Sequence, residues 1–363
     1  MNKKTLIAAA ASLAAAFVPT LALAQSSVTV FGVADLAVRR VDNEGRGSVS
    51  SVVSGSNSTS RLAFRGTEDL GGGAFAGFHL EHGIAMDVGT QATAVLFFDR
   101  RSTVSIGSRS LGEIRIGRDF IPSYNNWGRY DPFSYVGAAS ASNFISATPV
   151  GPIRSAFGTG LASTVRSSNA LQWLLPAGLG GVNGELMWAK REGGTAANGQ
   201  HDVRGGRLGW AAGAFDVSAA MTVSSNDLTT AIGSDFKDLA LAGRVDLGAV
   251  RVSLGARRFT LADARQTNLL LGLWVPVGTG EIKLSVNQAN LSGRVGSTSI
   301  GANDARQVGI GYVHAFSKRS AAYATLSRVD NRGAATYAVP GGPSGLAGGG
   351  HSTGVEFGVR HNF

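Results

Sequence analysis

The chain has 363 residues and no cysteine, so disulfide bonds contribute nothing to its stability. Its formal charge is +9, but the arginines are spread along the chain without a basic run, which argues against a nucleic-acid partner. Mean hydropathy is only +0.09, and no long apolar stretch follows residue 24, which excludes transmembrane helices. Such a chain can cross a membrane only as a closed β-barrel, in which every backbone polar group is hydrogen-bonded.

The first segment has the pattern of a secretory signal peptide. Lys3 and Lys4 precede an apolar run that ends in a small-x-small cleavage site, Ala22-Leu23-Ala24. A membrane anchor is the alternative, but a proline interrupts the run and no basic flank follows it. The sequence therefore predicts a signal peptide over 1–24 and a single domain over 25–363.

Beyond the signal peptide, segments of about ten residues alternate between two kinds of side chain, as strands of a barrel do. In residues 237–247, leucines and a valine dominate the odd positions, whereas Asp238, Arg244 and Asp246 take even ones. A period of two places the two sets on opposite faces of a β-strand. The pattern predicts sixteen strands, at 27–41, 58–69, 74–87, 97–108, 112–119, 165–175, 180–191, 202–213, 214–224, 237–247, 250–257, 266–276, 280–291, 305–315, 319–330 and 352–363.

The connections between these segments alternate in length. Short turns are predicted at 71–73, 108–111, 177–180, 248–249, 278–279 and 316–318. Long polar loops are predicted at 42–57, 192–201, 225–235, 292–304 and 331–351. Outer-membrane barrels combine an even number of strands with short periplasmic turns and long extracellular loops. The predicted fold class is therefore all-β, a 16-stranded antiparallel transmembrane β-barrel.

A soluble β-sandwich is the alternative, because its strands also alternate between apolar and polar residues. Two features count against it. The polar faces are rich in Arg, Asp, Glu and Ser rather than lysine, and aromatic residues gather near predicted strand ends, at Phe97-Phe98, Trp173, Trp188, Trp210 and Phe259. Aromatic girdles at the two membrane interfaces produce this distribution.

One connection, over about 120–164, is far too long for a hairpin and contains four prolines. Its tyrosines, phenylalanines and Trp127 indicate a packed segment, since disordered segments are poor in aromatic residues. We expect this long third loop to fold into the lumen of the barrel and to narrow it.

The last ten residues form a patterned strand that runs to the end of the sequence. Phe357, Val359 and Phe363 share one parity, and Arg360 lies on the other. Since termini fray unless a sheet holds them, we expect this strand to pair with the first strand, near 28–41, and to close the barrel.

Several motifs of the chain resemble those of the Gram-negative general porins, and the resemblance is strongest to the neisserial and Burkholderiales branch of that family. They are, in order, SSVTVFGVADLAV at 26–38, SRLAFRGTEDLG at 60–71, GEIRIGRDF at 112–120, DPF at 131–133 and the terminal Phe363. The resemblance covers essentially the whole mature chain. It implies a homotrimer of sixteen-stranded barrels in the outer membrane of a Gram-negative bacterium, with no cofactor, whose third loop forms a constriction.

The resemblance also implies a basic ladder on the barrel wall, carried here by Arg61, Arg100 and Arg166, with Arg65 beside Arg61. Strand parity supports part of this set, because Leu62 and Phe64 point outward and leave Arg61 and Arg65 inward. Parity likewise places Arg166 inward, but it does not decide between Arg100 and Arg101. A single strand arginine is as often a solvated or loop-bonded residue.

The loop differs from that of cation-preferring porins, which carry several carboxylates there. Between residues 121 and 164 the only acid is Asp131, which is accompanied by Arg129 and Arg154, while Asp119 lies at the root of the loop. Rings of arginine favour anions, and the guanidinium stays charged at biological pH. We therefore expect a passive diffusion channel for small hydrophilic solutes that prefers small anions.

Two other functions are less favoured. A barrel enzyme needs a nucleophile and base or a metal set, and only His79 and His82 are close in sequence. On a strand these two face opposite sides, so we expect neither a metal site nor enzyme activity. An outer-membrane adhesin is the second alternative, since the loops at 42–57 and 331–351 are long enough to bind a partner, but it leaves the internal arginines unexplained.

The resemblance further implies partners outside the channel. These are outer-membrane lipid, lipopolysaccharide and the barrel-assembly machinery, for which Phe363, with Phe357 and Val359 behind it, acts as the recognition signal.

Overall fold

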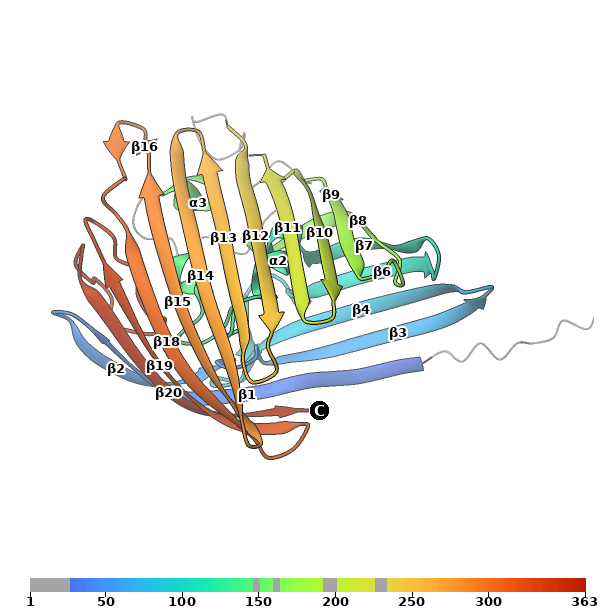
Figure 1. Ribbon diagram of the computed structural model, residues 1–363, viewed down its shortest axis with the longest axis horizontal. Helices are drawn as coiled ribbons and strands as arrows, with labels where there is room; N and C mark the ends of the chain where they lie inside the picture. Colours follow the sequence, from blue (N-terminus) through green and yellow to red (C-terminus); the bar gives the residue numbers. More distant parts are fainter. Residues whose placement is uncertain (1–26, 146–150, 159–163, 192–200, 226–233) are drawn as a thin grey trace, which may run out of the picture.

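The computed structural model describes residues 27–145, 151–158, 164–191, 201–225 and 234–363 (Figure 1). The predicted signal peptide lies outside the described residues, as do most of the two loops predicted at 192–201 and 225–235. The first half of the wall consists of β1 (Ser27–Asn43), β2 (Gly47–Ser54), β3 (Arg61–Gly71), β4 (Ala74–Ala85), β6 (Arg101–Ser108), β7 (Gly112–Phe120), β8 (Arg166–Leu174) and β9 (Val182–Ala189).

The second half consists of β10 (Val203–Ala212), β11 (Phe215–Ser224), β12 (Phe236–Asp246), β13 (Arg251–Leu261), β14 (Ala264–Val277), β15 (Gly280–Ser292), β18 (Ala305–Ala315), β19 (Ser320–Asn331) and β20 (His351–Asn362). Short paired segments accompany them, namely β5 (Thr90–Gln91), β16 (Arg294–Val295) and β17 (Thr298–Ser299). All the strand pairs are antiparallel, and from β3 to β20 each wall strand pairs with the next.

The wall closes where the last strand meets the first. β20 pairs with β1 from Val33 opposite Asn362 to Asn43 opposite Ser352, as the terminal pattern predicted. On its other side β1 pairs with β3 along one half and with β2 along the other, so β2 and β3 together form one interrupted wall strand. The result is a closed 16-stranded barrel, which confirms the predicted fold class.

The structure corrects three local predictions. Half of the loop predicted at 42–57 is strand β2, because the serine-rich segment still alternates and finds a complete pairing partner in β1. The strand predicted at 97–108 begins at Arg101, so Phe97 and Phe98 belong to the preceding connection. Phe259 is not part of an outer girdle, because it is fully buried inside, whereas Trp173 and Trp188 are exposed as predicted.

Burial is inverted with respect to a soluble protein. On β12, Asp238 is 1% exposed and Ala240 is fully buried, while Leu239 and Leu241 are 50% and 62% exposed. The other wall strands repeat this pattern of polar or small residues inside and large apolar residues outside. Since exposing leucine to water is unfavourable, the outer surface is suited to a hydrocarbon environment. None of the helices in the described ranges is long and apolar enough to span a membrane.

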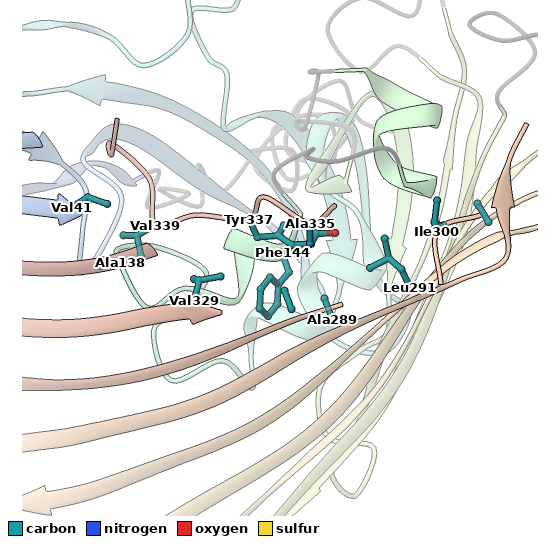
Figure 2. Close-up of a cluster of buried hydrophobic side chains, with 12 residues drawn as sticks. Val41, Ala138, Phe144, Ala289, Leu291, Ile300, Val329, Ala335, Tyr337 and Val339 are labelled. Atoms are coloured by element: carbon teal, nitrogen blue, oxygen red, sulfur yellow. The ribbon is translucent and has the colours of Figure 1, made fainter. Parts of the chain in front are cut away.

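The long connection after β7 lies within the curve of the wall (Figure 1). It contains α2 (Pro122–Gly128), the 3-10 helix η2 (Ala141–Phe144) and α3 (Pro152–Phe157). Phe144 from this connection packs with Tyr337 and Val339 from the loop between β19 and β20, and with Ala289 and Leu291 from the wall (Figure 2). The two loops therefore share one apolar core on the inside of the barrel.

The interruption between β2 and β3 is held by one buried carboxylate. Asp35 on β1 is fully buried and accepts hydrogen bonds from the backbone amides of Ser56 (3.3 Å), Asn57 (2.9 Å) and Ser58 (2.7 Å). The hydroxyl of Tyr323 on β19 donates to the same carboxylate. Asp35 thus holds in place the segment 55–60, which connects β2 to β3 and is part of neither strand.

We expect Asp35→Ala to lower the free energy of unfolding by about 2 kcal/mol or more, because it leaves buried amides without an acceptor. The measurement is the temperature at which the folded barrel loses its compact migration in an SDS gel. Asp42→Ala, which removes an exposed carboxylate from the same strand, is the matched control. Equal unfolding temperatures for the two variants would contradict the assigned role of Asp35.

Candidate functional site

The inner wall carries a cluster of arginines around one glutamate. Glu81 on β4 accepts a hydrogen bond from Arg100 Nε at 2.5 Å, and Arg61 Nε on β3 lies 3.6 Å from the same carboxylate. His79 Nε2 lies 3.2 Å from Glu81 on its other side. One carboxylate therefore faces two guanidinium groups, and it cannot neutralise both.

A second group of arginines continues around the wall on β6 and β7. Arg101 lies 3.3 Å from Asp119, and Arg115 lies 2.7 Å from Glu113 and 3.5 Å from Asp119. Asp119, which was predicted at the root of the loop, is thus shared between two arginines of the wall. The basic surface is continuous from β3 to β7.

A bulge in β7 turns one further arginine inward. The pairing of β7 with β8 shifts register between Gly117 and Asp119, and both Arg118 and Asp119 are buried although they are neighbours in sequence. Arg118 Nε donates to the backbone carbonyl of Asp99 (2.7 Å), and its Nη1 donates to Ser168 Oγ (2.9 Å). Strict alternation would have placed Arg118 on the lipid side.

Arg166 at the start of β8 forms no ion pair within the described residues. Its guanidinium carbon lies 4.4 Å from the centre of the Phe120 ring, and its buried Nε has no hydrogen-bond partner within the described residues. The positive charges of Arg100 and Arg118 are close enough to repel it. The site therefore holds several guanidinium groups together without a carboxylate for each.

The structure also places the residues that strand parity left open. Arg101 on β6 lies opposite Glu81 in the register of β4 with β6 and therefore points inward. Arg100 lies in the connection before β6, and its side chain forms an ion pair with the same glutamate. Both therefore face the lumen. Arg65 also points inward, with its guanidinium 5.0 Å from the centre of the Phe31 ring.

The loop opposite this wall contributes an aromatic side chain. Tyr124 on α2 lies within electrostatic range of both Arg61 and Arg166. Its ring stacks on Phe120, with the ring centres 4.8 Å apart. The loop therefore places the tyrosine of α2 beside two arginines of the wall.

The only acid of the loop does not face the arginines. Asp131 is 2% exposed, and its carboxylate accepts hydrogen bonds from the backbone amides of Phe133, Tyr135 and Ala141, each at 3.0 Å. Burial raises the pKa of the Asp131 carboxyl, and these three donors partly oppose the rise. Asp131 therefore acts as an internal acceptor that shapes the loop.

The two loop arginines have different surroundings. Arg129 forms an ion pair with Asp216 on β11 at 2.8 Å, and the same carboxylate lies 3.1 Å from Arg244. Arg154 is exposed on α3. Neither is brought next to the cluster around Glu81 by any contact in the described part of the chain.

A buried ion pair anchors the loop to the wall. Arg257 on β13 and Asp238 on β12 lie 2.6 Å apart, with side chains 0% and 2% exposed. Arg257 also donates to the hydroxyl of Tyr135 (3.1 Å) and to the carbonyl of Thr164 (3.2 Å), and Ser123 Oγ donates to Asp238 (2.6 Å). Both ends of the loop are thus bonded to the same pair of wall residues.

Glycines on the inner face make room for the loop. A β-carbon on Gly255 would lie 2.8 Å from the Trp127 ring, and one on Gly272 would lie 2.6 Å from Pro132. Gly309 contacts Ala139 even more closely. The loop consequently packs directly on the backbone of β13, β14 and β18.

The fold and the site together define a class of protein. A closed barrel with an apolar outer surface and a charged interior, narrowed by an inner loop, is a transmembrane diffusion channel. Among the described residues no three His, Asp or Glu side chains are grouped as a metal ion would need.

The comparisons with known proteins identify the family. Residues 9–334 match the model of a family described as "Gram-negative porin". The chain therefore belongs to the Gram-negative porins. It is 34% identical to outer membrane porin protein 32 of Delftia acidovorans over 384 aligned positions, which cover 99% of this chain and all of that protein. It is an outer-membrane porin, and this family consists of channels rather than enzymes.

Solved structures agree with this assignment. The anion-selective porin from Comamonas acidovorans matches with a TM-score of 0.80 and 31% identity, covering 93% of this chain and all of that one. OmpT of Vibrio cholerae, folded in vitro, matches with a TM-score of 0.65 over 93% of this chain and 98% of its own. At 12% identity the second match supports the fold alone.

Sequence reasoning did not assign Arg115, Arg118 or Arg360 to the basic ladder, and it left open whether Arg101 faces the lumen. Parity within GEIRIGRDF would have found Arg115, because Ile114 and Ile116 are exposed on the outer face. Parity in the last strand would have found Arg360, whose Nη1 donates to Asn57 at 2.7 Å. Arg118 had no such signal, because its direction depends on the bulge.

If Arg257 and Asp238 hold the loop, Arg257→Gln will loosen it and leave a buried carboxylate without its charged partner. We expect larger single-channel conductance with frequent fluctuations between levels, measured in planar bilayers. Arg258→Gln, the exposed neighbour on the same strand, is the control and should leave the conductance unchanged. A steady wild-type conductance in Arg257→Gln would rule out the anchoring role.

Proposed function

We propose that this porin is a passive diffusion channel for small hydrophilic solutes that selects anions at its constriction. The single observation that carries the proposal is the charge balance around the passage. Arginines outnumber carboxylates on β3 to β8, and the only acid of the facing loop, Asp131, is bonded within the loop. In this proposal Arg61, Arg65, Arg100 and Arg166, joined by Arg101, Arg115 and Arg118, form the basic side of the constriction.

The strength of such a site suits passage rather than capture. Two unit charges about 4 Å apart interact by about 1 kcal/mol in water and by about 4 kcal/mol at an effective dielectric constant near 20. A hydrated lumen lies between these limits. An anion is therefore drawn to the arginines and still leaves rapidly, and the carboxylates of Glu81 and Asp119 weaken its binding further.

The similarity to a solved porin supports the same direction of selectivity. The structure with a TM-score of 0.80 and 31% identity is described as that of an anion-selective porin. In our proposal the loop over about 120–164, with Asp119 at its root and Arg129, Asp131 and Arg154 within it, sets the width of the constriction and adds no negative charge to it.

The remaining expectations complete the proposed biology. Residues 1–24 direct export as a signal peptide, and the mature chain assembles into a homotrimer in the outer membrane. The last strand, with Phe357, Val359 and Phe363 on one parity, is recognised by the barrel-assembly machinery. The folded protein contacts outer-membrane lipid and lipopolysaccharide.

The first test is the zero-current potential of the purified protein in a planar bilayer under a salt gradient. We expect an anion-selective potential, and we expect Arg61→Ser and Arg166→Ser each to move it toward the cation side. Arg328→Ser, which removes an exposed outward arginine, is the matched control and should not change it. A cation-selective wild-type protein would refute the role of the arginines while leaving the channel itself intact.

The second test concerns assembly. Deletion of Phe363 removes the terminal aromatic residue, whose backbone amide bonds to the carbonyl of Gly32 at 3.2 Å. We expect less assembled trimer in the outer membrane but an unchanged conductance for each assembled channel. Phe316→Ala, at an exposed turn, is the control. An unchanged yield of trimer after the deletion would argue against a recognition signal at Phe363.

A further inference from the structure

The outer face of the barrel carries three cations on three adjacent strands. Lys237 on β12, Arg258 on β13 and Arg265 on β14 are all exposed and all lie at outward positions, at the end of the barrel where β12 follows a long connection and a two-residue turn, 262–263, joins β13 to β14. Figure 1 shows these strands side by side on the near side of the wall. We call Lys237, Arg258 and Arg265 the outer cation triad.

The strand register sets the spacing of the triad. Thr260 on β13 pairs with Lys237 on one side and with Arg265 on the other, so these two cations lie at one level, two strands apart. At about 4.8 Å per strand, their backbones are about 10 Å apart. Arg258 stands between them, two residues or about 7 Å further down β13.

The triad lacks carboxylate partners. Within the described ranges none of its three members forms an ion pair, and Arg258 Nε donates only to Thr267 Oγ1, at 3.2 Å. Two other outward arginines at this end are paired, Arg204 with Asp235 at 2.8 Å and Arg328 with Asp330 at 2.9 Å, whereas the outward Arg40 and Arg306 stand singly on other strands and form no ion pair within the described ranges. The exposed carboxylate of Asp263, in the turn after β13, lies nearby in sequence and opposes only part of the positive charge.

An apolar groove lies directly below the triad on the same outer face. Its volume is about 560 Å³, and its lining includes Leu241, Leu254, Leu269 and Leu271, with the small residue Ala256 between them. Ala256 is the next outward residue after Arg258 on β13. A cationic end and an apolar body are therefore joined in one surface.

The opposite end of the same strands has no such feature. The outward residues near the short turns are valines, Val245 on β12, Val252 on β13 and Val275 on β14. The cations therefore belong to one membrane leaflet only. With the long loops on the cell exterior, as porins have them, this is the outer leaflet.

We propose that the outer cation triad and the groove below it form a binding site for a phosphorylated, multiply acylated glycolipid of the outer leaflet. The triad contacts the phosphate groups of the lipid, and the groove receives an acyl chain. This proposal rests on the proposed function, in which lipopolysaccharide is a partner of the porin. It adds one defined binding location for that partner on the outer wall. Charge complementarity selects this occupant, since a neutral lipid leaves the triad unpaired.

The experiment measures binding of bis-phosphorylated lipid A to the purified full-length protein by native mass spectrometry in detergent. We expect the triple variant Lys237→Gln, Arg258→Gln, Arg265→Gln to raise the dissociation constant by about tenfold or more, from the loss of three cations near the headgroup. The matched control, Arg40→Gln, Arg306→Gln, Arg328→Gln, removes the same charge from exposed outward positions on other strands and should change it by less than about threefold. Ala256→Phe, which fills the groove without changing charge, should also weaken binding.

Four results would overturn the proposal. Equal losses in the two triple variants would indicate general charge attraction, and equal affinity for dephosphorylated lipid A would indicate an apolar contact alone. Full displacement of the lipid by millimolar inorganic phosphate would indicate an ion site without a lipid. A change in subunit number caused by Ala256→Phe would assign the groove to a second copy of the chain.

The zero-current potential, measured on the same variants, separates this proposal from the proposed selectivity. We expect it to be unchanged in every variant, because the triad lies on the outside of the wall. A cation-selective wild-type channel that still loses lipid A in the triad variant would refute only the selectivity.

Discussion

The need to pair every backbone amide and carbonyl within hydrocarbon is the constraint on which the rest of this structure depends. Strands meet it only when the sheet has no edge, and here the edge is removed by the pairing of β20 with β1. The closure also fixes which face of each strand is inner and which is outer. Every inward arginine and every outward leucine follows from that assignment, because successive side chains on a strand alternate.

A closed wall of this size encloses a space that side chains of the wall do not fill, and the loop after β7 occupies part of it. Its position results from complementary features of both partners. Glycines at 255, 272 and 309 let the loop approach the wall backbone, while the Arg257–Asp238 pair bonds to residues near both ends of the loop. The loop is therefore held against the part of the wall formed by β11 to β18, whereas Arg61, Arg100 and Arg166 lie on the part formed by β3 to β8.

Electrostatics then divides the arginines into two groups with different tasks. Arg257 is matched with the single carboxylate of Asp238, whereas Arg129 shares Asp216 with Arg244, and both ion pairs stabilise the position of the loop. Arg61 and Arg100 share Glu81, and Arg166 forms no ion pair within the described residues, so positive charge is left over on this part of the inner wall. On the outer face, Arg204 is paired with Asp235, whereas no member of the outer cation triad has an acid partner among the described residues.

The sequence by itself determined the barrel, the number of its wall strands and the inward direction of Arg61 and Arg65, because these depend on a period of two that each strand carries locally. Family resemblance added Arg100, which parity had left undecided. Tertiary structure alone decided the roles of Asp131 and Arg118. The first is hidden by hydrogen bonds within the loop and the second is turned inward by a bulge. It also decided that the serine-rich segment after β1 is a strand and that Phe259 lies inside. These features depend on which segments contact one another in the closed barrel, and those contacts cannot be predicted from the local pattern of residues.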